Sequence, residues 1–302
     1  MSEGAGKLGQ RNKQMVKLSP LLKFLSLAAI SVVVGWRTLL GVFSLAWNNE
    51  AYTHILLILP ITIGMVYLDW PAVRSKLAPN WRAGGILLIA ALLAAGFAKW
   101  KLAADVQLAI YTLALVLWWI GAFVGCCGTR VSRSLLFPLC FLFWLVPFPA
   151  FLLNAIVGLL QQGSAYAARL LFAGTGVPVV QDGILLTIPG LTVEVAQECS
   201  SIRSSMMLVV TTMVLAQLFL RSPWRKALVI GLTIPLSVAK NGLRIFTIAM
   251  LGTRVDPGFL NGRLHHHGGV IWLAIALVVI FFLLWILRED KSGHNEIQYS
   301  AQ

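Results

Sequence analysis

The sequence predicts an all-α integral membrane protein with about eight transmembrane helices. Of its 302 residues, 58% are hydrophobic and only 12% are charged, whereas a soluble domain carries about a quarter charged residues. The apolar residues form continuous runs that suit membrane helices, and not the alternating ten-residue segments of a membrane β-barrel. Helices also satisfy their own backbone hydrogen bonds within lipid.

The distribution of charge predicts the orientation of the chain. The formal net charge of +13 comes from Lys and Arg residues that lie mostly in short loops and near the N-terminus. This pattern is typical of the cytoplasmic loops of an inserted protein, and it argues against a nucleic-acid partner. We expect a cytoplasmic N-terminal tail at 1–17, a polytopic membrane domain at 18–288 and a cytoplasmic C-terminal tail at 289–302. No cleavable signal peptide is expected, because the first twenty residues are polar and basic.

Four helices are predicted in the first half of the chain, at 18–45, 55–70, 84–98 and 106–124. The outer loop between the first two contains Tyr52 and His54, which we interpret as an interface aromatic residue and a helix-capping histidine. The alternative is that both residues join the functional site. Lys99 and Lys101 lie in a brief outer turn, which is an exception to the expected placement of basic residues on the cytoplasmic side. The cytoplasmic side is marked by basic residues after the second and fourth helices: Arg74, Lys76, Arg82, Arg130 and Arg133.

The middle of the chain is predicted to leave the membrane. A fifth apolar run starts near Leu135 and meets Pro147 and Pro149, which break or kink a helix. We therefore expect a helix end at the outer surface, followed by an interfacial helix at 152–173 whose polar residues are Gln161, Gln162, Ser164 and Arg169.

A small extracytoplasmic hairpin or meander is predicted next. Segments 177–180 and 184–188 have strand character and are separated by Gln181-Asp182-Gly183. Pro189-Gly190 then forms a second turn before 191–195.

Three more helices, at 200–220, 227–251 and 267–287, bring three reactive side chains to one membrane surface. Basic residues at 221–226 place the connection between the first two in the cytoplasm, so Cys199 lies at the outer end of its helix. Arg244 is about 27 Å from the cytoplasmic end of the next helix, at 1.5 Å per residue. His265 precedes the last helix, again on the outer side.

The residue types suggest nucleophilic chemistry. Unpaired N–H groups and the positive end of the helix dipole favour a thiolate at Cys199, and Arg203 adds a positive charge one turn later. A guanidinium in an apolar helix costs several kcal/mol unless it is paired or hydrated, which makes Arg244 a functional candidate. It can stabilise the oxyanion that forms when a thiolate attacks an amide. The alternatives are an inert apolar cysteine and the snorkelling of Lys240 and Arg244 towards the surface.

The three consecutive histidines His265, His266 and His267 do not suit a metal site. Their side chains on a helix would point about 100° apart, so they cannot all ligate one ion. One histidine that acts as general base and acid beside a thiolate fits better. We therefore expect no metal or organic cofactor. The rival hypothesis is a transporter in which Arg244 and Lys240 bind an anionic substrate.

Three segments resemble motifs of the exosortase/archaeosortase family of integral-membrane cysteine transpeptidases. The family motifs are Cys-Ser-Gly-Ile-Arg-Ser, Asn-x-x-Arg and His-x-x-Gly-Gly. The resemblance extends over about 47–287, includes the Tyr-x-His block at Tyr52 and His54, and departs from the pattern at Ser201, where glycine is usual. The matching segments here are Glu198-Cys199-Ser200-Ser201-Ile202-Arg203-Ser204, Asn241-Gly242-Leu243-Arg244 and His265-His266-His267-Gly268-Gly269.

The resemblance implies specific roles for these residues. Cys199, Arg244 and His265 would be catalytic, with His265 favoured among the three histidines by its spacing to the glycine pair. The supporting residues would be Arg203, Asn241, His266, His267 and Glu198.

The resemblance also implies a function: a membrane-embedded cysteine protease or transpeptidase in the inner membrane of a prokaryote, with its active site facing outward. Its partners would be exported, membrane-anchored proteins that end in a sorting signal, which is a short motif, a transmembrane helix and a basic tail. The cut protein would form a thioester with Cys199 and pass to an acceptor in the envelope.

Overall fold

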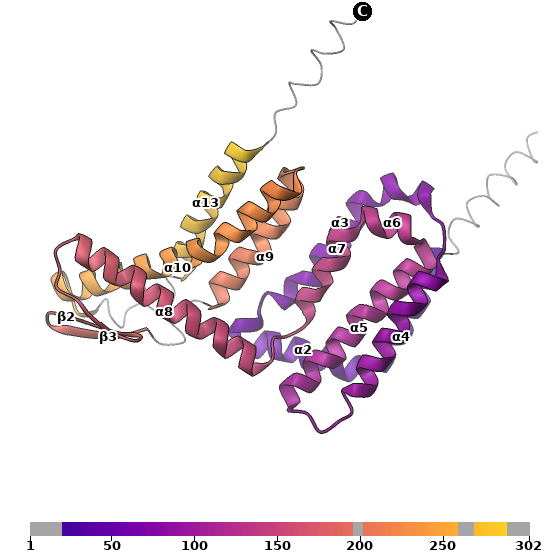
Figure 1. The fold of residues 1–302 in the computed structure, drawn as a ribbon, viewed down its shortest axis with the longest axis horizontal. Coiled ribbons are helices and arrows are strands. Elements are labelled where there is room, and N and C mark those ends of the chain that lie inside the picture. The colour runs from indigo at the N-terminus through magenta and orange to yellow at the C-terminus, as the bar shows by residue number, and fades with distance from the viewer. Residues whose placement is uncertain (1–19, 196–201, 259–268, 289–302) are drawn as a thin grey trace, which may run out of the picture. The chain divides into compact units, whose positions relative to one another are not determined.

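The structure is a computed structural model that describes residues 20–195, 202–258 and 269–288 (Figure 1). Within these ranges, 5 helices are long and apolar enough to cross a membrane, and the number rises to 7 if each of two bent helix pairs is one span. A further apolar helix, Trp81–Phe97, is shorter. The prediction of a helical membrane protein is confirmed, and the count of eight crossings stays a prediction.

The contacts divide the chain into two compact units, Met1–Leu152 and Leu153–Gln302. In unit 1, the described elements after the first helix are α2 (Trp36–Asn48), η1 (Glu50–Tyr52), α3 (Ile55–Val73), η2 (Arg74–Lys76), α4 (Trp81–Phe97), α5 (Ala104–Cys127), α6 (Thr129–Ser134), α7 (Leu136–Phe141) and η3 (Leu142–Leu145). In unit 2 they are α8 (Ala150–Gly174), which begins in unit 1, β1 (Val180–Asp182), β2 (Leu185–Ile188), β3 (Leu191–Glu194), α9 (Ile202–Phe219), α10 (Pro223–Arg254) and α13 (Gly269–Leu287).

The first predicted helix, 18–45, is not continuous. Helix Pro20–Val34 meets α2 at an angle of 75°, with Gly35 at the bend. A Cβ at Gly35 would lie 2.8 Å from the side chain of Leu115, so the glycine allows α5 to approach closely. The prediction of one continuous helix at 18–45 was therefore wrong, because the chain bends at Gly35 within an otherwise uninterrupted apolar run.

Helices α4 and α5 pack with their backbones in contact. A Cβ at Gly84 would lie 2.6 Å from the carbonyl oxygen of Gly121 and 2.6 Å from the backbone of Gly125. Gly121 and Gly125 are four residues apart, so they occupy one face of α5 and form the small-xxx-small pattern of closely packed membrane helices. Among the described elements of unit 1, this hairpin forms the most extensive helix–helix contact.

The predicted helix break at Pro147 and Pro149 is confirmed. The apolar run ends with η3 at Leu145, and α8 begins at Ala150. Two side chains from other elements hold this break. The hydroxyl of Tyr52 donates to the carbonyl of Phe148 at 2.7 Å, and the Asp105 carboxylate accepts from the N–H of Ala150 at 2.7 Å.

The sheet of unit 2 is a three-stranded antiparallel meander in the order β1-β2-β3. Asp182 pairs with Leu185 and Ile188 with Leu191, so each connection has two residues. Gly183 and Gly190 have φ angles of 58° and 82°, which glycine adopts without strain. The predicted first strand, 177–180, was displaced, because β1 starts at Val180 and includes Gln181 and Asp182, which were assigned to the turn. Gly183 does lie in the turn, as predicted.

Two apolar clusters hold unit 2 together. One joins the sheet to α8 and α10, and Figure 1 shows β2 and β3 beside α8; its buried residues are Ala165, Ala168, Phe172, Leu186, Ile188, Val195, Ile245 and Ala249. The other joins α9, α10 and α13 through Leu208, Ala216, Leu220, Val229, Ala276, Ile280 and Leu284. The helix α10 belongs to both clusters and is therefore the central element of this unit.

The polar residues of α8 divide into two groups. Gln162 and Arg169 are exposed, whereas Gln161 and Ser164 are buried against protein. Their assignment to an interfacial face was therefore wrong for Gln161 and Ser164. Gln161 can be buried because it has a hydrogen-bond partner within unit 2: its Nε2 donates to the carbonyl of Val195 at 2.7 Å.

Candidate functional site

One face of α10 carries a buried polar cluster. Ser237, Lys240, Asn241 and Arg244 recur at helical spacing, which places them on the same side of the helix. Lys240 is 5% exposed and Arg244 is 8% exposed, although both carry long charged side chains. Helices α8, α9, α10 and α13 contain no Asp or Glu. Two basic side chains are therefore buried one helical turn apart on this face of α10.

Lys240 links this cluster to the start of α9. Its Nζ donates a hydrogen bond to the hydroxyl of Ser204, which is buried in the first turn of α9. The alternative of Lys240 snorkelling to the surface is therefore wrong, because its ammonium group bonds within the protein. Arg244 is also buried, as expected for a guanidinium with a role inside the unit.

A second bond fixes the register of the same helix pair. Lys226, near the start of α10, donates to Oε1 of Gln217, near the end of α9, at 2.7 Å. Ser204 and Gln217 are 13 residues apart on α9, and Lys226 and Lys240 are 14 residues apart on α10. The two helices therefore run antiparallel with almost no register shift, and the first turn of α9 is level with Lys240.

Two of the predicted supporting residues, Arg203 and Asn241, are described, and they differ in their surroundings. Asn241 is fully buried beside Lys240. Arg203, in the first turn of α9, is exposed. Gly242 follows Asn241, and a Cβ there would lie 2.5 Å from Cβ of Ala167. The Asn-Gly pair thus marks the place where α10 packs closely against α8.

The other predicted site residues lie outside the described parts of the chain. They are Glu198, Cys199, His265, His266 and His267. Their convergence with Arg244 stays a prediction. The structure does describe the flanking positions, namely Val195 at the end of the sheet, Ile202 at the start of α9 and Gly269 at the start of α13.

Tyr52 and His54 lie in unit 1 and are not what the sequence suggested. Tyr52 is 6% exposed and His54 is 2% exposed, so neither is an interface residue. The His54 side chain makes no capping hydrogen bond at α3, and its ring lies edge-on to Trp144, with centroids 5.9 Å apart. Both interpretations were therefore wrong, because these side chains pack around the segment that precedes α8.

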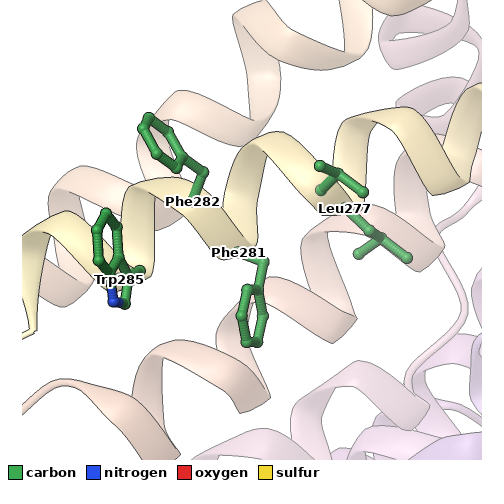
Figure 2. A pocket seen from close by; sticks show the side chains of 5 residues that line it. Leu277, Phe281, Phe282 and Trp285 are labelled. Carbon is green, nitrogen blue, oxygen red and sulfur yellow. The ribbon is translucent and has the colours of Figure 1, made fainter.

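No group of three or more His, Cys, Asp or Glu side chains that could hold a metal ion occurs among the described residues. A shallow apolar hollow lies on α13. Figure 2 shows four of its lining residues, Leu277, Phe281, Phe282 and Trp285. Because its lining is almost entirely apolar, this surface suits lipid chains and offers no catalytic group.

Comparison with protein families gives one match of direct relevance. The model described as transmembrane exosortase matches residues 46–282, which is most of the chain and includes all three motif segments. The chain belongs to the transmembrane exosortase family. Searches of curated proteins and of solved structures give no match. As an exosortase, the protein is an integral membrane protein of a family of sorting enzymes.

The sequence analysis assigned neither Gln161 nor Ser204 of this exosortase to the functional site. Both are buried and hydrogen-bonded between elements of unit 2. One signal was available in the sequence. An amide or hydroxyl within an apolar helix must find a partner when it is buried, but the sequence does not identify that partner.

Proposed function

We propose that this exosortase is a cysteine endopeptidase and transpeptidase that cleaves the C-terminal sorting signals of membrane-anchored exported proteins and transfers them to an acceptor in the cell envelope. The observation that supports this most strongly is the buried Arg244 on the polar face of α10. It lies on the helix that packs beside the one preceded by Cys199.

The register of α9 on α10 supports the pairing of Arg244 with Cys199. Ser204 is level with Lys240. Position 199 is five residues before Ser204, and Arg244 is four residues after Lys240. Because the helices are antiparallel, both displacements run in the same direction, and each corresponds to about 6–8 Å at 1.5 Å per residue. If the register of α9 on α10 were extended by little more than one turn before α9, position 199 would be level with Arg244.

The proposed reaction has two acyl-transfer steps. The Cys199 thiol gives its proton to His265, and the thiolate attacks the carbonyl carbon of the scissile amide. Arg244 stabilises the resulting oxyanion. The carbon–nitrogen bond then breaks, the amine leaves with the proton from His265, and a thioester remains on Cys199. In the second step, the acceptor gives its proton to His265 and attacks the thioester, and the cysteine thiol is restored.

Family membership favours this function over the transporter hypothesis. The two hypotheses differ in what they require of Cys199, since a transporter that binds anions through Arg244 and Lys240 does not need a thiol. Cys199→Ala and Cys199→Ser variants should be inserted in the membrane but fail to process a co-expressed, tagged protein with a sorting signal. Mass spectrometry of the unmodified enzyme should reveal an acyl adduct on Cys199. Normal processing by both variants would exclude the thioester.

The role of His265 is tested by three separate alanine variants. His265→Ala should abolish processing, because no other group is assigned to proton transfer. His266→Ala and His267→Ala should retain more of it and serve as matched controls. Activity that survives the first change and is lost with one of the others would assign the role to that histidine instead.

A further inference from the structure

We propose that Gln161 and Lys240 are positioning residues that hold the two ends of the chain segment carrying Cys199. This inference rests on the proposed function, since it concerns how the nucleophile is presented. Neither residue contacts the reacting atoms in this proposal. Each acts through a hydrogen bond to the chain on one side of Cys199.

The N-terminal end of the segment is held by Gln161. Val195, the last described residue before the segment, is completely buried. Its N–H donates to the carbonyl of Ile184 at 3.0 Å, and its carbonyl accepts from Gln161 Nε2 at 2.7 Å. The backbone of Val195 is therefore fixed both to the sheet and to α8.

The C-terminal end is held by Lys240. The Ser204 hydroxyl accepts from Lys240 Nζ, and both side chains are buried. A buried, charge-assisted hydrogen bond is stronger than a neutral one and restricts the geometry of both partners. It therefore fixes the first turn of α9 against the middle of α10, one helical turn from Arg244.

The two anchor residues, Gln161 and Lys240, lie on helices that pack against each other, α8 and α10. Gly242 of α10 packs against Ala167 of α8, and both helices contribute to the same apolar cluster. Cys199 is four residues after Val195 and five before Ser204. At about 3.5 Å per residue it must remain within about 14 Å of Val195 and 18 Å of Ser204. The anchors thus limit how far the cysteine can lie from Val195 and from the first turn of α9.

The alternative is that these bonds only satisfy buried polar groups. The chain provides a matched control for each residue. Lys226 makes the same type of bond between the same two helices, but at their other end. Gln162 is the exposed neighbour of Gln161. A purely structural role predicts similar behaviour from Lys240 and Lys226, whereas a positioning role predicts a difference in chemistry.

The test uses the full-length enzyme in nanodiscs with a tagged sorting-signal substrate. The variants are Gln161→Met, Lys240→Met and Ser204→Ala, with Gln162→Met, Lys226→Met and Ser204→Thr as controls. Two quantities are measured: kcat and KM for processing, and the rate of Cys199 alkylation by iodoacetamide, determined by peptide mass spectrometry. If Lys240→Met does not fold, Ser204→Ala and Gln161→Met test the two anchors.

We expect the three anchor variants to lower kcat by about ten- to a hundred-fold with KM within about twofold, because small misplacements of a reacting group have effects of this size. Alkylation of Cys199 should slow in parallel. The controls should stay within about twofold, and Ser204→Thr should retain activity. In the Lys240→Met/Ser204→Ala double variant the effects should not add, because both changes remove the same bond.

Anchor variants that fold and match their controls in kcat and alkylation rate would overturn the proposal. Cys199→Ala, measured in the same assay, separates this failure from that of the proposed function. If Cys199→Ala processes substrate, the cysteine mechanism itself fails. If Cys199→Ala is inactive and the anchor variants are normal, only the positioning role is wrong.

Discussion

Arg244 and Lys240 occupy one face of α10 but have different proposed roles. Lys240 bonds to Ser204 and so stabilises the contact between α9 and α10. Arg244 lies one turn further along α10 and is also buried. A planar guanidinium can donate two parallel hydrogen bonds to an oxyanion, whereas an ammonium acts as a point charge. The two cations are therefore not interchangeable.

At Arg244 we predict a loss of catalysis that a lysine does not fully restore. Arg244→Met should lower kcat by about 10²–10³-fold, the usual effect of removing an oxyanion donor. Arg244→Lys should recover only part of this loss, because it keeps the charge without the paired donors. Processing kinetics measure the effect. Arg254→Met, at the exposed end of the same helix, is the control, and equal losses for both arginines would contradict the assignment.

Tyr52 supports the break before α8 through its hydroxyl group. Tyr52→Phe should remove this partly buried hydrogen bond to the carbonyl of Phe148, and a typical hydrogen bond contributes about 0.5–1.5 kcal/mol. We therefore expect a lower midpoint of thermal unfolding in detergent. Tyr67→Phe, on an exposed tyrosine of α3, should leave the midpoint unchanged. A Tyr52→Phe midpoint as high as that of the control would mean that the bond contributes nothing to stability.

Among the elements, the α4–α5 hairpin depends on the absence of side chains. Gly84 and Gly85 are adjacent in α4 but differ in their surroundings. A Cβ at Gly84 would meet the backbone of α5 at 2.6 Å, whereas a Cβ at Gly85 would meet nothing within 4 Å. The two glycines therefore provide a matched pair for the effect of one methyl group.

We predict that alanine at Gly84 and alanine at Gly85 have different effects on the free energy of unfolding. Gly84→Ala should destabilise the protein by about 1–3 kcal/mol, because overpacking forces the helices apart. Gly85→Ala should be neutral or stabilising by up to about 1 kcal/mol, because alanine favours helix over glycine. Thermal unfolding of the purified variants gives the comparison. Equal effects would show that α4 and α5 do not pack at Gly84.

The helices show what periodicity can and cannot predict. Their positions followed from apolar runs of the right length, and the break at Pro147 followed from proline chemistry. The bend at Gly35 did not, because a single glycine in an apolar run is compatible with a straight helix. The burial of Gln161 was also missed, since its partner, the Val195 carbonyl, is 34 residues away and is brought near only by the sheet.

At the scale of the whole molecule, the sequence predicted the family through three short motifs, and the family match agrees. The described structure adds the buried polar face of α10, which holds Arg244 and Asn241. The meeting of Cys199 and His265 with Arg244 stays a prediction. It depends on contacts between segments that are distant in sequence, which residue patterns do not encode.

The final prediction concerns which side of the membrane the site faces. The α9 and α10 helices are each long enough for one crossing. The sheet before α9 and the chain after α10 should therefore lie on one side, and the connection at Arg221 on the other. This arrangement depends only on α9 and α10 each crossing the membrane once. It therefore does not depend on the number of crossings in unit 1.

Three exposed positions test this orientation in the full-length protein: Asp182 in β1, Arg221 between α9 and α10, and Asp256 after α10. In intact cells, a membrane-impermeant maleimide should label the Asp182→Cys and Asp256→Cys variants, whereas Arg221→Cys should require permeabilisation. Peptide mass spectrometry distinguishes these sites from the native cysteines. The reverse labelling pattern would place the Cys199 end of α9 on the cytoplasmic side. An enzyme that processes exported proteins could not then use this site, because its substrates would reach the opposite surface.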